Sequence, residues 1–174
     1  MELELLTKDL PVSIDPLLFR HVMRKFATGV TVLTVRDGEI IHGMTANSFT
    51  SVSLSPTLVL VCILNGSTTH DFVSHAGSYA VNILSDTQVA LAQRFAKQVS
   101  VPSEPFVDIS YHSVATGAPI FDECLGYVDC RVVAAYPAGD HTIFVGEVLA
   151  AGFGQATGDP LLWLEGQYKS RAEE

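Results

Sequence analysis

The stretch from Gly43 to Pro56 holds the residues of this chain whose types and spacing best suit binding chemistry. Small polar side chains crowd it, whereas the segments on both sides are strongly apolar. These side chains are Thr45, Asn47, Ser48, Thr50, Ser51, Ser53 and Ser55. They place little bulk over the main chain, which leaves backbone N–H groups and hydroxyls open to hydrogen bonding. The pattern predicts a surface against which a flat polar ligand lies close to the backbone.

A second group of hydroxyls stands before a predicted helix. In the sequence of residues 65–70 (NGSTTH), Ser67 and Thr69 come next to the free N–H groups of a helix start, where phosphate groups bind readily. The same residues also fit simple helix capping without any ligand. Arg94 supplies the cationic half of a phosphate site if its own helix packs nearby. Otherwise it is a solvated residue that favours the C-terminus of that helix.

His141 lies in a predicted hairpin turn, Gly139-Asp140-His141, that feeds a strand. A lone histidine in a turn is more often a surface residue than a catalyst. Its assignment therefore depends on the context that the rest of the chain provides.

Several other chemistries lack a motif. Residues 152–158 (GFGQATG) miss the dinucleotide-binding glycine spacing by one position. Asp159-Pro160 then follows where a helix should begin, and the segment lies too near the C-terminus for a βαβ unit. Neither a P-loop nor a G-x-S-x-G elbow occurs, so nucleoside triphosphate hydrolysis and serine esterase chemistry have no support.

The cysteines and histidines do not predict a metal site. Cys62, Cys124 and Cys130 form no C-x-x-C pair and are interpreted as reduced, mostly packing thiols. His70 and His75 are five residues apart, a spacing that does not place two ligands on one helical face, and no H-E-x-x-H motif occurs. We expect no metal.

Composition limits the class of protein. The 174 residues predict one domain spanning 1–174, with 48% hydrophobic residues to build its core. The formal charge of −9, without a basic run, excludes nucleic acid as a partner. No apolar stretch is long enough to span a bilayer, and the acidic N-terminal sequence MELELLTKDL lacks the features of a secretory signal. We expect a cytoplasmic protein without a membrane partner.

The elements that must position these residues are read from caps, turns and periodicity. Asp15-Pro16 starts a predicted amphipathic helix whose apolar residues repeat until Gly29. The remaining expected elements are a hairpin at Asp37-Gly38, a buried strand at 58–64, a helix to Ala76 stopped by Gly77, a strand at 79–84, a helix from the capping box of Ser85 and Gln88, and strands at 126–136 and 142–150. Residues 98–120, rich in Pro, Ser and Gly, predict a long exposed excursion.

Antiparallel signals at both ends of the chain, with helices only as inserts, favour a small closed or partly open β-barrel over a doubly wound α/β sheet. The predicted fold class is therefore mainly β with inserted helices.

Four segments, in this order along the chain, resemble the flavin reductase-like family, the small reductase components of two-component flavin-dependent monooxygenases. They are 19–33 (FRHVMRKFATGVTVL), 43–56 (GMTANSFTSVSLSP), 78–96 (SYAVNILSDTQVALAQRFA) and 139–148 (GDHTIFVGEV). The resemblance covers about residues 16–168. It implies an FMN-binding split β-barrel with Greek-key-like topology, usually a homodimer, that binds FMN or FAD and reduces it with NADH or NADPH.

The resemblance also implies a site. Carried over by position, the residues lining the isoalloxazine ring are Thr45, Ala46, Asn47 and Ser48, with Ser53 and Ser55 nearby. Those on the phosphate side are Ser67, Thr69 and Arg94, and the residue where the nicotinamide approaches is His141. The chain departs from the family at Asn65-Gly66, where members often carry a basic residue, and in the less typical Trp163 and Glu165. Hydride transfer needs two stacked rings and little acid–base machinery, so a missing catalytic triad is no objection.

The leading interpretation is an NAD(P)H:flavin oxidoreductase that supplies reduced flavin by diffusion to a separate flavin-dependent oxygenase, with FMN preferred to FAD and NADH to NADPH. Two alternatives remain open. One is a flavin- or haem-binding split-barrel protein that does not turn over nicotinamide, and the other is an oxidase with permanently bound FMN. The Gly139-Asp140-His141 turn favours the reductase.

Overall fold

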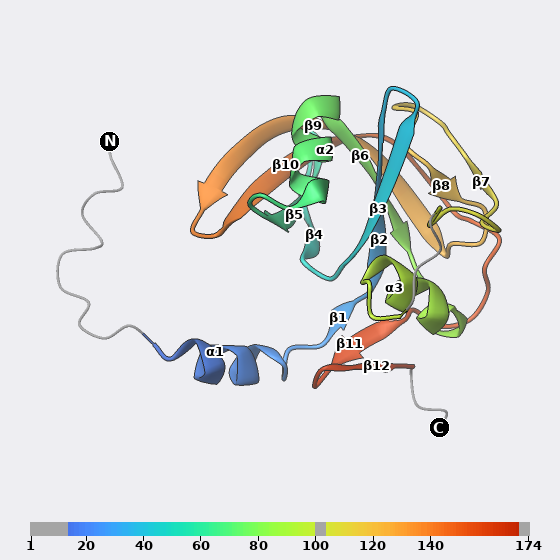
Figure 1. Ribbon diagram of the computed structural model, residues 1–174. Helices are drawn as coiled ribbons and strands as arrows, with labels where there is room; N and C mark the ends of the chain where they lie inside the picture. The colour runs from blue at the N-terminus through green and yellow to red at the C-terminus, as the bar shows by residue number, and fades with distance from the viewer. Residues whose placement is uncertain (1–13, 100–103, 171–174) are drawn as a thin grey trace, which may run out of the picture.

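The computed structural model describes residues 14–99 and 104–170. The N-terminal sequence MELELLTKDL and residues 100–103 of the predicted excursion lie outside the described residues. The strands of the main sheet are β2 (Thr31–Asp37), β3 (Ile40–Ala46), β4 (Phe49–Leu54), β5 (Thr57–Leu64), β6 (Ser78–Ile83), β9 (Gly126–Ala138) and β10 (His141–Gly152). Their order is β3-β2-β6-β9-β10-β5-β4, and every neighbouring pair is antiparallel (Figure 1).

The sheet curves back on itself. Its edge strands β3 and β4 stand at opposite ends of the strand order, yet only Asn47 and Ser48 separate them in the chain. Because a two-residue link spans at most about 10 Å, the ends of the two edge strands must come close together at this corner. The predicted class, mainly β with inserted helices, is confirmed.

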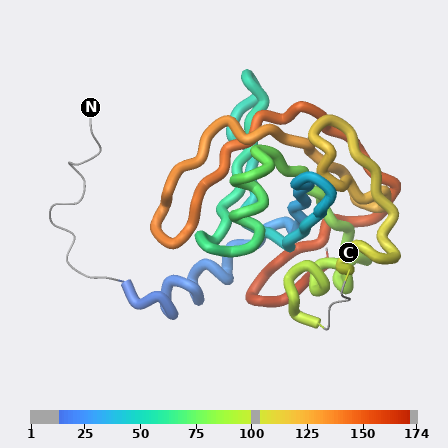
Figure 2. Tube along the Cα trace, turned by 45° about the horizontal axis from the view of Figure 1, so that its top comes forward, coloured from blue at the N-terminus to red at the C-terminus, as the bar shows by residue number. Residues whose placement is uncertain are grey.

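Strand β2 is buried on both faces, so its residues do not alternate between core and solvent. On one face, Leu33 and Val35 join a core with Val73 of α2 (Thr68–Ala76). On the other face, Val32 packs in a second core with Phe95 of α3 (Val89–Phe95), which follows a short 3-10 helix, η2 (Asp86–Gln88). The helices thus cover opposite faces of β2, and they occupy separate places in Figures 1 and 2.

Local signals placed several boundaries correctly. Gly77 ends α2 with a left-handed φ of 63°, and the Ser85–Gln88 capping box is present. Hairpin β2–β3 turns at Gly38-Glu39, one residue later than predicted, and hairpin β9–β10 turns at Gly139-Asp140. The described part of the 98–120 excursion includes β7 (Tyr111–His112), which pairs with β8 (Ile120–Phe121).

A small second sheet joins the two ends of the chain. It contains β1 (Thr28–Gly29), β11 (Leu162–Leu164) and β12 (Gln167–Lys169), in the order β1-β11-β12. The turn between β11 and β12 holds Glu165 and Gly166, both with positive φ. Glu165 also forms an ion pair with Lys25 and donates its backbone N–H to the Arg24 carbonyl at 2.8 Å. This contact fixes the chain just after the N-terminal helix.

The N-terminal helix α1 (Pro16–Met23) is shorter than predicted and buries none of its residues. It stands away from the sheets in both views (Figures 1 and 2). Its large apolar side chains and those beside it are 46–67% exposed: Ile14, Leu17, Leu18, Phe19, Val22, Met23 and Phe26. A run of exposed apolar side chains of this kind is typical of an interaction surface.

Candidate functional site

A cavity of about 730 Å³ opens where the two edges of the main sheet meet. Its lining comes from the end of α1 with β1, from the corner with β4, and from β11: Arg20, Met23, Arg24, Phe26, Ala27, Thr28, Gly29, Asn47, Ser48, Phe49, Thr50 and Trp163. Its volume falls within the range of small-molecule sites, roughly 300–1,000 Å³. The predicted polar segment therefore forms one wall of a ligand-sized cavity.

A smaller cavity of about 190 Å³ adjoins the first and shares Asn47 and Trp163 with it. Tyr168 closes one side, with its ring 4.9 Å from that of Trp163 between centroids and its hydroxyl donating to Gln98 Oε1 at 3.2 Å. Burial raises the pKa of Tyr168, which keeps this hydroxyl protonated. Two aromatic rings thus stand beside the corner.

The corner itself is tied to the structure on both sides. Asn47 Nδ2 donates to Thr28 Oγ1 at 3.1 Å, and Ser48 Oγ donates to the Cys62 carbonyl at 2.8 Å. These bonds hold β3 and β4 against β1 and β5 at the point where the sheet edges meet. The structure thus places Asn47 and Ser48 at the cavity, as the predicted ring site requires.

Thr45 and Ala46 do not present their side chains to the same surface, because successive residues of a strand face opposite sides. The Thr45 hydroxyl donates to the Ala92 carbonyl of α3 at 2.6 Å and lines the smaller cavity. The Ala46 side chain instead packs in the core with Leu33 and Val35. The prediction that all four residues line one ring therefore requires correction for the Ala46 side chain.

Gly43, at the start of the polar segment, has a packing role. A Cβ atom there would lie 2.7 Å from the Phe95 ring, so only glycine lets α3 approach β3 this closely.

Ser53 and Ser55 lie farther along, at the β4–β5 turn. The Ser55 N–H donates to Ser53 Oγ at 3.2 Å, and Leu54 between them is 91% exposed. Neither serine is among the residues that line the two cavities. The structure does not bring them to the corner within a single chain.

The expected phosphate group of Ser67, Thr69 and Arg94 is not assembled. Ser67 caps α2 by accepting the His70 N–H at 3.2 Å, and buried Thr69 hydrogen-bonds His42 Nε2 at 2.8 Å. Arg94 lies on α3, which is apart from α2 in both views (Figures 1 and 2).

Arg94 has a carboxylate partner of its own on α3's side of the sheet. Asp108 binds the Arg94 guanidinium at 2.8 Å, and this hydrogen bond lowers the pKa of Asp108 below its ordinary value. The condition for a shared phosphate site, that α3 packs near the start of α2, is not met.

Two other cationic side chains, and not Arg94, line the larger cavity. Arg20 and Arg24, in and directly after the last turn of α1, both line it. The apolar periodicity of this segment predicts a packing face and does not by itself single out the two arginines. A usable signal was present, since two arginines four residues apart stand out in a chain of formal charge −9.

His141 is the first residue of β10 and lies beside the corner without lining the cavity. It pairs with Leu64, and Ile143 pairs with Cys62, the residue that binds Ser48. Two residues along a strand span roughly 7 Å. The hairpin turn is therefore next to the end of the sheet that carries the cavity.

The His141 ring is oriented by its neighbour. Its Nδ1 lies 2.7 Å from Asp140 Oδ1, and this hydrogen bond lowers the pKa of Asp140 below its ordinary value. A carboxylate that accepts the Nδ1 proton leaves Nε2 as the nitrogen that meets a ligand. The side chain is 42% exposed, so a ligand can reach it.

Within residues 14–99 and 104–170, no group of three or more His, Cys, Asp or Glu side chains gathers as metal ligands would. No helix in the same ranges is long and apolar enough to cross a membrane. The arrangement can hold a flat ring on small residues beside Trp163 and an anionic group near two arginines.

Comparison with known proteins identifies the family. The family model described as "Flavin reductase like domain" matches residues 23–172. The chain is 41% identical over 150 residues to the FMN reductase (NADH) SmoA of Agrobacterium fabrum (strain C58 / ATCC 33970). The aligned residues cover 86% of this chain and 83% of that protein. It is 36% identical over 155 residues to the reductase component of 4-nitrophenol 4-monooxygenase/4-nitrocatechol 2-monooxygenase of Rhodococcus opacus, covering 89% and 80%.

A longer relative and a solved structure also match the chain. A probable flavin reductase of Rhizobium meliloti (strain 1021) is 41% identical over 138 residues, and there the match spans only 43% of a longer protein. The solved structure of the flavin reductase PheA2 in its native state superposes with a TM-score of 0.84 at 42% identity, covering 92% of this chain and all of that one. The chain belongs to the flavin reductase-like family.

Proposed function

We propose that this protein is an NADH-dependent flavin reductase that transfers a hydride to FMN and releases the reduced flavin to a separate oxygenase. The observation that carries the proposal is the cavity at the Asn47–Ser48 corner, with small residues on one wall and arginines at its edge. The names of the relatives, an FMN reductase (NADH) and a monooxygenase reductase component, support both the activity and the partner. They favour this function over a ligand-storing protein or an oxidase.

The residues present fit a flavin ring. At Gly29, which lines the cavity, a Cβ atom would meet nothing within 4 Å, so open space lies directly over the backbone of β1. Asn47 and Ser48 face the same cavity, and Trp163 offers an aromatic wall. Backbone N–H groups of the corner are suited to hydrogen-bond the ring oxygens and to favour negative charge on the reduced ring.

Arg20 and Arg24 suit the phosphate of FMN. The acidic chain concentrates positive charge at this cavity, which gives a local hold without general attraction for anions. A modest hold is appropriate because the reduced flavin has to leave as the product.

His141 is assigned to the nicotinamide. With Nδ1 engaged by Asp140, Nε2 is free to hydrogen-bond a group of the incoming cosubstrate, and the register places the hairpin next to the corner. Bound flavin accepts the hydride, so the residues have only to align the two rings and keep them at contact.

We further propose a split-barrel dimer in which a second copy of the chain covers α1. The exposed apolar side chains of this helix support the dimer, because no element within residues 14–99 and 104–170 buries them. The curved sheet whose edges meet at Asn47–Ser48 supports the split barrel. A cytoplasmic location stays a prediction.

The test is NADH oxidation with FMN, repeated with FAD and with NADPH. We expect turnover that requires added flavin and is faster with NADH. His141→Ala should slow nicotinamide-dependent reduction more than it weakens flavin binding. Absence of turnover with every flavin and nicotinamide pair contradicts the function, whereas equal losses of reduction and of binding contradict only the role of His141.

A further inference from the structure

The turn that carries His141 is held by one residue from another part of the chain. The backbone N–H of Asn65, just after β5, donates to the Asp140 carbonyl at 3.0 Å. The Nδ2 amide of the same residue donates to the Gly139 carbonyl at 3.3 Å. Asn65 therefore binds both carbonyls of the two-residue turn that precedes His141.

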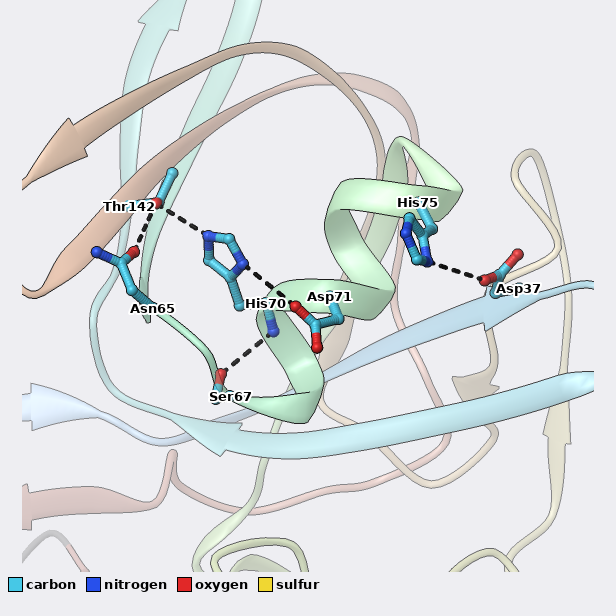
Figure 3. Close-up of polar contacts among 7 residues, drawn as sticks. All are labelled: Asp37, Asn65, Ser67, His70, Asp71, His75 and Thr142. Atoms are coloured by element: carbon cyan, nitrogen blue, oxygen red, sulfur yellow. Dashed lines mark hydrogen bonds and ion pairs between the residues drawn. The ribbon is translucent and has the colours of Figure 1, made fainter.

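The bonds continue from Asn65 through Thr142 to His70. Thr142 Oγ1 donates to Asn65 Oδ1 at 2.7 Å, and His70 Nε2 lies 3.0 Å from the same Thr142 oxygen (Figure 3). A hydroxyl has a single proton, which here goes to Asn65. His70 Nε2 must therefore carry the proton that it donates to Thr142, and the direction of every bond in the chain is fixed.

His70 is itself firmly placed. Its backbone N–H is bound by the Ser67 cap at 3.2 Å, and its ring packs edge-on against Phe144 at 5.4 Å between centroids. Helix α2, which carries it, inserts Val73 into the main core. Thr142 is only 8% exposed, so its two hydrogen bonds are partly shielded from water, whereas Asn65 is exposed and its bond to the Gly139 carbonyl lies at the surface.

We propose that Asn65, Thr142 and His70 are positioning residues that set the β9–β10 turn and thereby aim His141 at the nicotinamide. The inference rests on the proposed role of His141 and extends it. Without these bonds the turn is held only by the strand pairing of β10 with β9 and with Leu64 of β5, and the residues from Tyr136 to Asp140 are exposed. Ångström-scale misplacement of a group that aligns reactants costs up to roughly 100-fold in rate.

Thr142→Val tests the inference because it removes the hydroxyl at nearly constant volume. We expect the rate of hydride transfer at saturating FMN to fall about tenfold, within the range for a misaligned group, while the Kd for FMN changes less than about twofold. Thr142→Ser keeps the hydroxyl and should restore most of the rate. Equal rates in the Val and Ser variants would overturn the proposal.

Thr34→Val is the matched control for loss of stability. Thr34 is also a buried threonine, and its hydroxyl donates to the Pro119 carbonyl at 2.5 Å on another part of the sheet. The Thr34→Val variant should lower the melting temperature as Thr142→Val does, yet leave the rate of hydride transfer unchanged. If Thr34→Val slows transfer equally, the effect comes from stability and the positioning role is refuted.

A double-mutant cycle separates this inference from the function on which it rests. If Thr142 acts through His141, then Thr142→Val in the His141→Ala background should cost less than about twofold further, because the losses of coupled residues are not additive. If the rate losses of the two single variants instead multiply in the double variant, the coupling is refuted while the reductase function stands. If the unaltered protein does not oxidise NADH with any flavin, the proposed function fails first.

Discussion

Gly29→Leu should exclude flavin from the cavity without disturbing the fold. Gly29 lies in β1 with a backbone conformation open to any residue, and a Cβ atom there meets nothing within 4 Å. The added side chain therefore starts in open space at a position that lines the cavity. Since glycine weakens a strand, the stability of the ligand-free protein should be equal or slightly higher.

The expected loss follows from the contact area. If the ring lies on β1, a leucine there lifts one ring face, roughly 100 Å², out of contact. At about 25 cal/mol per Å² this is about 2.5 kcal/mol, or about 70-fold in Kd. Gly29→Ala, which adds one methyl group, should give a smaller loss.

The assay uses the single tryptophan of the chain. Trp163 lines the same cavity and pairs with Thr28, the neighbour of Gly29, so bound flavin should quench its fluorescence. Ala151→Leu, at an exposed position of β10, adds the same side chain away from the cavity and should bind FMN normally. A Gly29→Leu protein that titrates with FMN like the unaltered protein would refute the placement of the ring.

Three further predictions concern phosphate, assembly and packing. Arg24→Gln should weaken FMN about tenfold but leave riboflavin, which lacks the phosphate, unchanged in the same titration, as expected for a lost charged hydrogen bond; equal losses would contradict a phosphate contact. Val22→Asp should convert a dimer to a monomer in light scattering, and an unaltered mass would show that α1 is not the interface. Gly146→Ala places a Cβ atom 2.5 Å from the Tyr79 hydroxyl and should cost about 1–3 kcal/mol in denaturant unfolding; an unchanged midpoint would contradict this packing.

Features set by neighbouring residues could be predicted from the sequence. The Asp15 cap, the Gly77 stop and the Ser85–Gln88 capping box depend on side chains within a few residues of one another. The polar Asn47–Ser48 segment stood out because its neighbours are apolar, and the structure places it at the cavity.

Features set by distant contacts could not be predicted. Phe26 continues the apolar spacing of α1, but the helix has already ended at Arg24, whose carbonyl accepts the N–H of Glu165 in the β11–β12 turn. Arg94 is drawn to Asp108, a pairing without a sequence signal. The face of the sheet to which the Ala46 side chain points depends on the strand register. A shift of the register by one residue moves every side chain to the opposite face.

The meeting of the sheet edges at Asn47–Ser48 has a consequence for the order of folding. Hairpins β2–β3 and β4–β5 are local, but β4–β5 joins the rest of the sheet only when β10 pairs with β5, with His141 opposite Leu64. The corner at Asn47–Ser48 is therefore complete only after β10, from the C-terminal half of the chain, has paired with β5. A ligand that binds at this corner needs the paired sheet, so it stabilises the native state by mass action.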